Sequence, residues 1–178
     1  DLVSYVISSE ATAWIGSSGR WYSILNQLVA NPTMSPGSLG VLTAQTYFSS
    51  YPTIERTIAV KDLSKIDDVM GKIYYFAYYL RGCLPGSASA ALYWRNQTQS
   101  FAPYTDYPEV YIDLYQYADF IVNNIDYDNL QTAATNLMSS ITSSVLYYTF
   151  YGYSSAKGYS IWFPDSGTYY EDGYSKYS

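Results

Sequence analysis

The sequence predicts an α/β fold, because short β-prone runs alternate with longer segments whose apolar residues recur at helical spacing. Val3–Ile7 and Thr57–Val60 are the β-prone runs of the first half. Near the end the period changes, and the aromatic-rich runs Leu146–Tyr151 and Tyr159–Phe163 predict a terminal strand pair. Neither an internal repeat nor a linker divides the chain, so we expect residues 1–178 to form one unit.

Two helices are expected between the first two strands. Asn31 and Pro32 end the earlier one, because proline cannot continue a helix. Ser35 followed by Pro36 is a favourable N-cap and first helical residue, and predicts a second helix through about Tyr47. The apolar residues of the earlier helix fall at helical spacing: Trp21, Ile24, Leu25, Leu28 and Val29.

The clearest helical stripe follows the second strand. It covers Ile66–Leu80, and we expect Gly82 to end the helix. Ser64 and Asp67 resemble the two ends of a capping box, with aspartate in place of the usual glutamate. A separate short helix is expected over about Ala88–Gln99.

Two further apolar stripes predict helices in the second half. The first comprises Tyr111, Leu114, Tyr115, Ala118, Ile121, Val122 and Ile125. The second comprises Leu130, Ala133, Ala134, Leu137, Met138, Ile141 and Val145. Between them, the oxygen-bearing side chains of Asp126 and Asp128 resemble the start of a calcium loop. The later glycine and glutamate are missing, so a helix N-cap at or near Asp128 explains the pattern better.

The composition restricts the chemistry that this chain can perform. The 178 residues contain one cysteine and no histidine. Histidine is the usual general base near neutral pH and the commonest metal ligand. Serine–histidine and cysteine–histidine dyads, and most catalytic zinc sites, are therefore excluded within this chain. Paired carboxylates or a serine–lysine pair remain open.

The net charge bears on the class of partner that this chain can bind. A net charge of −6 and a pI of about 4.4 argue against a nucleic acid as partner.

No apolar run approaches the roughly 18 residues that a membrane span needs. The chain is also tyrosine-rich, with 24 tyrosines and only 13% charged residues, which suggests a surface solvated by hydroxyl groups. An extracellular location explains this composition, and a general composition bias explains it equally well.

Five short segments occur in an order and spacing that point to one known family. They are Tyr5–Glu10, Gly19–Tyr22 with Ile24, Leu25 and Leu28, Ala59–Lys65, Asp113–Ala118, and Lys157–Pro164. Together they span nearly the whole chain. They resemble the clostripain family of cysteine peptidases, in the portion that follows the catalytic cysteine.

The resemblance implies the C-terminal portion of a caspase-like α/β fold, in which helices flank a central sheet. In that family a His–Cys dyad cuts after basic residues, often with calcium dependence and proteolytic maturation. Both dyad positions lie upstream of the matched portion. Cys83, which we expect in a loop after a helix, matches no nucleophile motif. The resemblance therefore implies no catalytic residue in this chain, and calcium only as a property of the family.

The loop after the first strand supplies the candidate substrate-pocket residues Ser9, Glu10 and Trp14. In the fold that the resemblance implies, this loop lies at the carboxyl edge of the sheet, where ligands of open α/β sheets bind. Glu10 would contact a basic substrate side chain and Trp14 would form a wall. The alternative, which we prefer, is a solvated loop carboxylate and a core tryptophan.

Asn96-Gln97-Thr98 is an N-glycosylation acceptor sequence, which agrees with an extracellular or cell-surface location. A glycosylated Asn96 would have to lie on the surface.

The sequence therefore favours the non-catalytic C-terminal portion of a secreted clostripain-like cysteine endopeptidase, inactive on its own, which shapes the substrate groove. Its partners would be the upstream portion of the same precursor, carrying the dyad, and a peptide substrate. The start at Asp1, directly before the strand Val3–Ile7, resembles a processing cut that leaves a strand edge exposed. The alternative is a catalytically inactive extracellular structural or binding protein that self-associates into a filament or surface layer.

Overall fold

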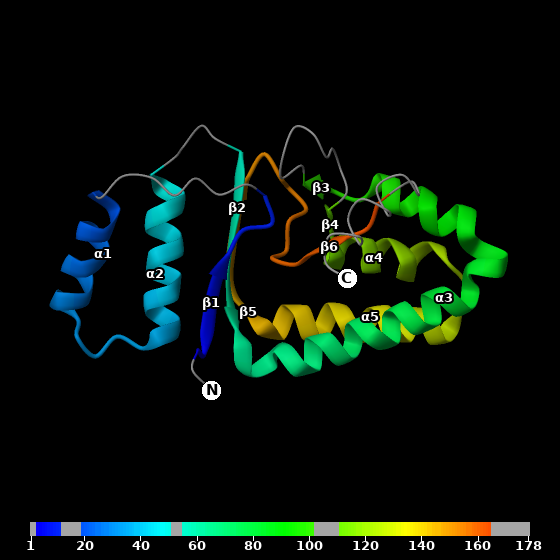
Figure 1. Ribbon diagram of the computed structural model, residues 1–178, viewed down its shortest axis with the longest axis horizontal. Coiled ribbons are helices and arrows are strands. Elements are labelled where there is room, and N and C mark those ends of the chain that lie inside the picture. Colours follow the sequence, from blue (N-terminus) through cyan, green and yellow to red (C-terminus); the bar gives the residue numbers. More distant parts are fainter. Residues whose placement is uncertain (1–2, 12–18, 51–54, 102–110, 165–178) are drawn as a thin grey trace, which may run out of the picture.

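The structure is a computed structural model that describes residues 3–11, 19–50, 55–101 and 111–164 (Figure 1). Its first sheet has three strands in the order β1-β2-β5, with both neighbouring pairs antiparallel. The strands are β1 (Tyr5–Ser8), β2 (Arg56–Asp62) and β5 (Val145–Tyr151). Val3–Ile7 and Thr57–Val60 are thus confirmed as strand regions, within one or two residues at each end.

Helices lie on both sides of this sheet (Figure 1). α2 (Pro36–Ser49) packs against all three strands, and α1 (Gly19–Ala30) packs on α2. The Ser35 hydroxyl accepts a hydrogen bond from the Ser38 backbone N–H, which confirms the predicted N-cap. The helices α3 (Ile66–Gln97), α4 (Leu114–Asn124) and α5 (Asp128–Ser144) lie on the other side.

The main hydrophobic core is formed where α3, α4 and α5 pack together. Its buried side chains come from the apolar stripes that predicted these helices, together with Tyr117, which the predicted stripe did not include. They include Val69 and Phe76 of α3, Leu114, Tyr117 and Ile121 of α4, and Leu130, Leu137 and Ile141 of α5. A smaller cluster of Ala44, Ile58 and Val60 joins α2 to β2.

The helix α3 differs from the two separate helices that the sequence predicts. It continues through Gly82 and Pro85, and Figure 1 shows that it changes direction along its length. A proline inside a helix removes one backbone hydrogen bond and bends the helix. Burial on both sides of the bend, at Phe76 and at Ala91, compensates for this local cost. Cys83 consequently lies within the helix rather than in a loop.

The start of α3 also differs from the prediction. A 3₁₀ turn, η1 (Leu63–Lys65), precedes it, and the Ser64 backbone N–H donates to Asp62 at 2.9 Å. Lys65 occupies the N-cap position without a side-chain hydrogen bond, so the expected capping box of Ser64 and Asp67 does not form.

Both predicted terminal strands are confirmed, but the prediction that they pair with each other is wrong. A second sheet has the order β3-β4-β6, from β3 (Ser100–Phe101), β4 (Tyr111–Asp113) and β6 (Ser160–Trp162). β5 pairs with β2 and β6 pairs with β4, so the two aromatic-rich runs belong to different sheets. Residues 152–159 cross from one sheet to the other, and they are too many for the tight turn of a hairpin.

Replacing Gly40 with valine should destabilise the protein by about 1–3 kcal/mol, because α2 lies close against β2 here. A Cβ atom at Gly40 would lie 2.9 Å from Val60 Cγ1, and Val60 is fully buried. The same substitution at Gly82, where a Cβ would meet nothing within 4 Å, is the control. Urea unfolding measures both, and equal stabilities would contradict the close contact of α2 with the sheet.

Candidate functional site: a carboxyl pair between the two sheets

The loop that follows β1 is fixed to β2 by one side chain. Thr57 is buried in β2, and its hydroxyl oxygen accepts hydrogen bonds from the backbone N–H groups of Glu10 at 2.8 Å and Ala11 at 3.3 Å. The Ser9 hydroxyl lies 3.1 Å from the same oxygen. Thr57 therefore determines where the carboxyl group of Glu10 is placed.

The Glu10 carboxyl group reaches from the first sheet toward the second. Its Oε2 accepts a hydrogen bond of 3.0 Å from the backbone N–H of Gly158, in the connection between β5 and β6. Gly158 has φ +97°, and a Cβ there would lie 3.0 Å from the Cβ of Ala59. Only glycine adopts this backbone conformation readily and leaves room for the close approach to β2.

Asp113 supplies the second carboxyl group of the pair. It ends β4 and is the N-cap of α4, where its Oδ1 accepts from the Gln116 backbone N–H at 2.7 Å. Its Oδ2 accepts from the Lys157 backbone N–H at 2.8 Å. Asp113 is fully buried, and its carboxyl group lies beside that of Glu10, because the consecutive N–H groups of Lys157 and Gly158 donate to the two. This carboxyl group thus joins a strand, a helix start and the crossing connection.

Burial, and next to it the negative charge of Asp113, raises the pKa of Glu10 to about 9 from an ordinary value of 4.5. Burial also raises the pKa of Asp113, although the N–H groups of Gln116 and Lys157 act in the opposite direction. The Lys61 ammonium opposes the shift at Glu10, and burial lowers the pKa of Lys61 itself. The raised pKa keeps Glu10 protonated at neutral pH, and the backbone N–H groups that donate to both oxygens of Asp113 favour a carboxylate there.

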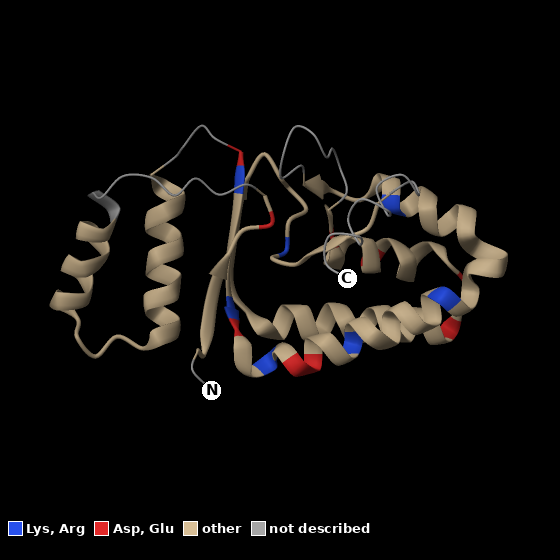
Figure 2. Ribbon diagram, in the orientation of Figure 1, with Lys and Arg blue, Asp and Glu red and all other residues tan. Residues whose placement is uncertain are grey.

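Two lysines from different elements accompany the pair. The Lys61 ammonium of β2 lies 4.2 Å from the centre of the Tyr159 ring. Lys157 donates to the Tyr148 hydroxyl at 2.9 Å. Elsewhere, several charged residues lie along α3, whereas α2 carries none (Figure 2).

The structure places the three predicted pocket residues differently from one another. Ser9 and Glu10 lie side by side on the loop after β1, and Glu10 is largely buried rather than a solvated loop carboxylate. Trp14 lies outside the described residues. Asp113, the partner of Glu10, was not predicted. A signal for its N-cap role was present, because a glutamine follows this aspartate three residues later.

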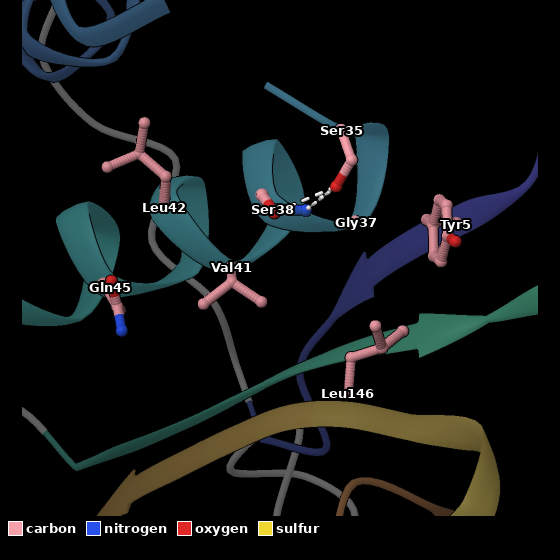
Figure 3. Close-up of a pocket in the computed structure, with 8 residues that line it drawn as sticks. All are labelled: Tyr5, Ser35, Gly37, Ser38, Val41, Leu42, Gln45 and Leu146. Carbon is pink, nitrogen blue, oxygen red and sulfur yellow. Dashed lines mark hydrogen bonds between the residues drawn. The ribbon is translucent and has the colours of Figure 1, made fainter. Parts of the chain in front are cut away.

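A surface hollow of about 330 Å³ lies elsewhere, between α2 and the first sheet (Figure 3). Tyr5 and Leu146 line it from β1 and β5, and Val41 and Leu42 line it from α2. Its remaining lining residues are uncharged, so the hollow offers no partner for a basic substrate side chain.

Metal binding receives no support from the described residues, which contain no group of three or more acidic or cysteine side chains suited to an ion. α5 begins at Asp128, and its N-cap residue Tyr127 makes no side-chain cap hydrogen bond.

Within the described ranges, no helix is long and apolar enough to cross a membrane.

The fold is that of a mixed α/β protein in which helices flank a small antiparallel sheet. The chain belongs to the clostripain family, whose peptidase C11 model matches residues 1–177. No curated protein matches the sequence.

The structure resembles that of an inactive zymogen C11 protease from Parabacteroides distasonis, with a TM-score of 0.57 and 16% sequence identity. The match covers 95% of this chain and 49% of the other, so this chain spans about half the length of that protease. The expected fold, a portion of the caspase-like architecture, is thereby confirmed.

Replacing Thr57 with valine should destabilise the protein by about 1–3 kcal/mol, because two backbone N–H groups lose their acceptor while the side-chain shape is kept. Thr135→Val is the matched control, since this exposed hydroxyl only donates to Gln131 within α5. Thermal or urea unfolding gives both values. A loss no larger than that of the control would show that Thr57 does not hold the loop.

Proposed function

We propose that this chain is the non-catalytic C-terminal portion of a secreted clostripain-like cysteine endopeptidase. It shapes the substrate groove for a His–Cys dyad that lies upstream in the same precursor. One observation carries the proposal: the family model matches residues 1–177 of a sequence that contains no histidine. The whole protein would use a thiolate nucleophile and a histidine as its acid–base partner.

The environment of Cys83 supports this division of roles. Its thiol donates to the Leu80 backbone carbonyl at 3.1 Å within α3. Burial raises the pKa of the thiol, which disfavours the thiolate that a cysteine nucleophile needs. Cys83 is therefore a packing residue, and the nucleophile belongs to the upstream portion.

The edge position of β1 supports assembly with that upstream portion. Among the described strands, β1 pairs with β2 alone, so its other edge presents backbone N–H and C=O groups. A strand from the missing portion would extend the sheet there. The loop with Ser9, Glu10 and Trp14 begins where β1 ends, and we assign it to the wall of the substrate groove.

A second candidate function is a self-associating extracellular protein without catalytic activity. The specific observation in its favour is at the opposite edge of the sheet. There β5 exposes Leu146, Tyr148, Phe150 and Tyr151. Exposed large apolar side chains along an edge strand favour association between copies.

Purifying the native protein from its source and identifying its chains distinguishes the two candidate functions. We expect it to contain a second chain with histidine and cysteine, which cleaves fluorogenic peptides after arginine or lysine. The isolated chain should be inactive, and Cys83→Ala should leave the activity of the assembled protein unchanged. Loss of activity in this variant, or hydrolysis by the isolated chain, would contradict the proposal. Filaments of this chain alone would establish the second candidate.

Glycosylation of Asn96 has its own test. Asn96 is exposed near the end of α3, as an attachment site requires. After expression through a eukaryotic secretory pathway, we expect one glycan that a glycosidase removes. Asn96→Gln should lack it by mass spectrometry, while Asn123→Gln, outside any acceptor sequence, should retain it.

A further inference from the structure

The hydrogen bonds around the two carboxyl groups show where the proton of the pair lies. Both oxygens of Asp113 accept backbone N–H groups, from Gln116 and Lys157. Glu10 has one such donor, Gly158, on Oε2. Its Oε1 is buried and has no hydrogen-bond donor among the described residues. A buried carboxylate oxygen without a donor is costly, whereas a protonated one brings its own hydrogen.

The acceptor for that hydrogen is the neighbouring carboxylate. The two carboxyl groups are neighbours, because the consecutive backbone N–H groups of Lys157 and Gly158 donate to Asp113 and to Glu10. Two adjacent buried carboxyl groups cannot both ionise without strong repulsion. We propose that a proton shared by Glu10 and Asp113 holds the Ser8–Ala11 loop against the second sheet, and that loss of this proton at alkaline pH releases the contact. The inference concerns this chain alone and goes beyond the proposed peptidase function.

The other charged groups near the pair come from two elements. β2 presents Lys61, whose ammonium stabilises a carboxylate at Glu10 and is itself placed over the Tyr159 ring. The crossing connection presents Lys157, whose side chain is held by Tyr148 of β5 and is influenced by Tyr115 of α4. With one proton on the pair, a single negative charge faces Lys61. Without it, two negative charges face the same lysine.

The direction of the pH effect follows from the raised pKa of Glu10. The unfolded chain releases this proton near pH 4.5, whereas the folded protein retains it up to about pH 9. The contribution to stability is therefore complete below pH 4.5 and decreases as the pH rises toward 9. Burial shifts the pKa of Asp113 in the same direction, so its effect has the same sign. One retained proton corresponds to about a tenfold change in the opening equilibrium per pH unit.

Hydrogen exchange at two backbone amides measures this opening directly. The N–H groups of Lys157 and Gly158 donate to Asp113 and Glu10, so they exchange only when the contact opens. Protection factors remove the intrinsic pH dependence of exchange. Between about pH 6 and pH 9, we expect the protection factors of both amides to fall by up to about tenfold per unit.

Glu10→Gln is the decisive variant. Its amide nitrogen donates to Asp113 and its amide oxygen accepts from Gly158, so it mimics the protonated acid and cannot titrate. We expect the protection in this variant to depend much less on pH than in the wild type. The same change at the exposed Glu55 should leave the wild-type profile intact. A Glu10→Gln profile that falls with pH as the wild type does would overturn the proposal.

A second measurement applies if Glu10→Gln does not fold. The carboxyl ¹³C chemical shift of Glu10 in the wild-type protein reports its protonation directly. We expect a protonated carboxyl group at pH 7 that titrates near pH 9. A carboxylate signal at pH 7 would overturn the proposal.

Discussion

The arrangement of the two sheets depends on the side chain of Asp113. One of its oxygens satisfies the first turn of α4, and the other fixes the connection that leaves β5 and becomes β6. Because the carboxyl group is fully buried, it needs these donors to remain charged. Glu10 then joins the first sheet to the same point. Hydrophobic packing within α3, α4 and α5 supplies the core, but these polar contacts set how the first sheet meets the second.

Local signals in the sequence were sufficient for several elements. Ser35 and Pro36 mark the start of α2, and the apolar stripes that run to Ile125 and to Val145 mark α4 and α5, although Val145 itself begins β5. Such signals work because N-caps and amphipathic faces are properties of a few neighbouring residues. The family resemblance also follows from short segments, which is why the caspase-like class could be recognised before any contact was known.

Features that depend on distant residues could not be predicted in this way. Gly82 was expected to end the helix, yet α3 continues through it and through Pro85, with buried residues on both sides. The aromatic pattern of β5 and β6 identifies strands but not their partners, because pairing is decided by β2 and β4. Glu10 was identified as a site residue from its place after a strand. Its burial against Asp113 depends on a contact between residues far apart in the chain.

The directions of the strands in the first sheet limit how copies of this chain could assemble. β1 and β5 both run antiparallel to β2, so the two outer edges run parallel to each other. If β5 of one copy paired with β1 of the next, the copies would be related by translation. Each added copy would expose the same two edges again, so the assembly would not close. If β1 of one copy paired with β1 of another, a two-fold axis would relate the copies, and this contact would produce only a dimer. This sheet could therefore form either an open-ended assembly or a closed dimer. Which of its two edge strands pairs between copies decides the outcome.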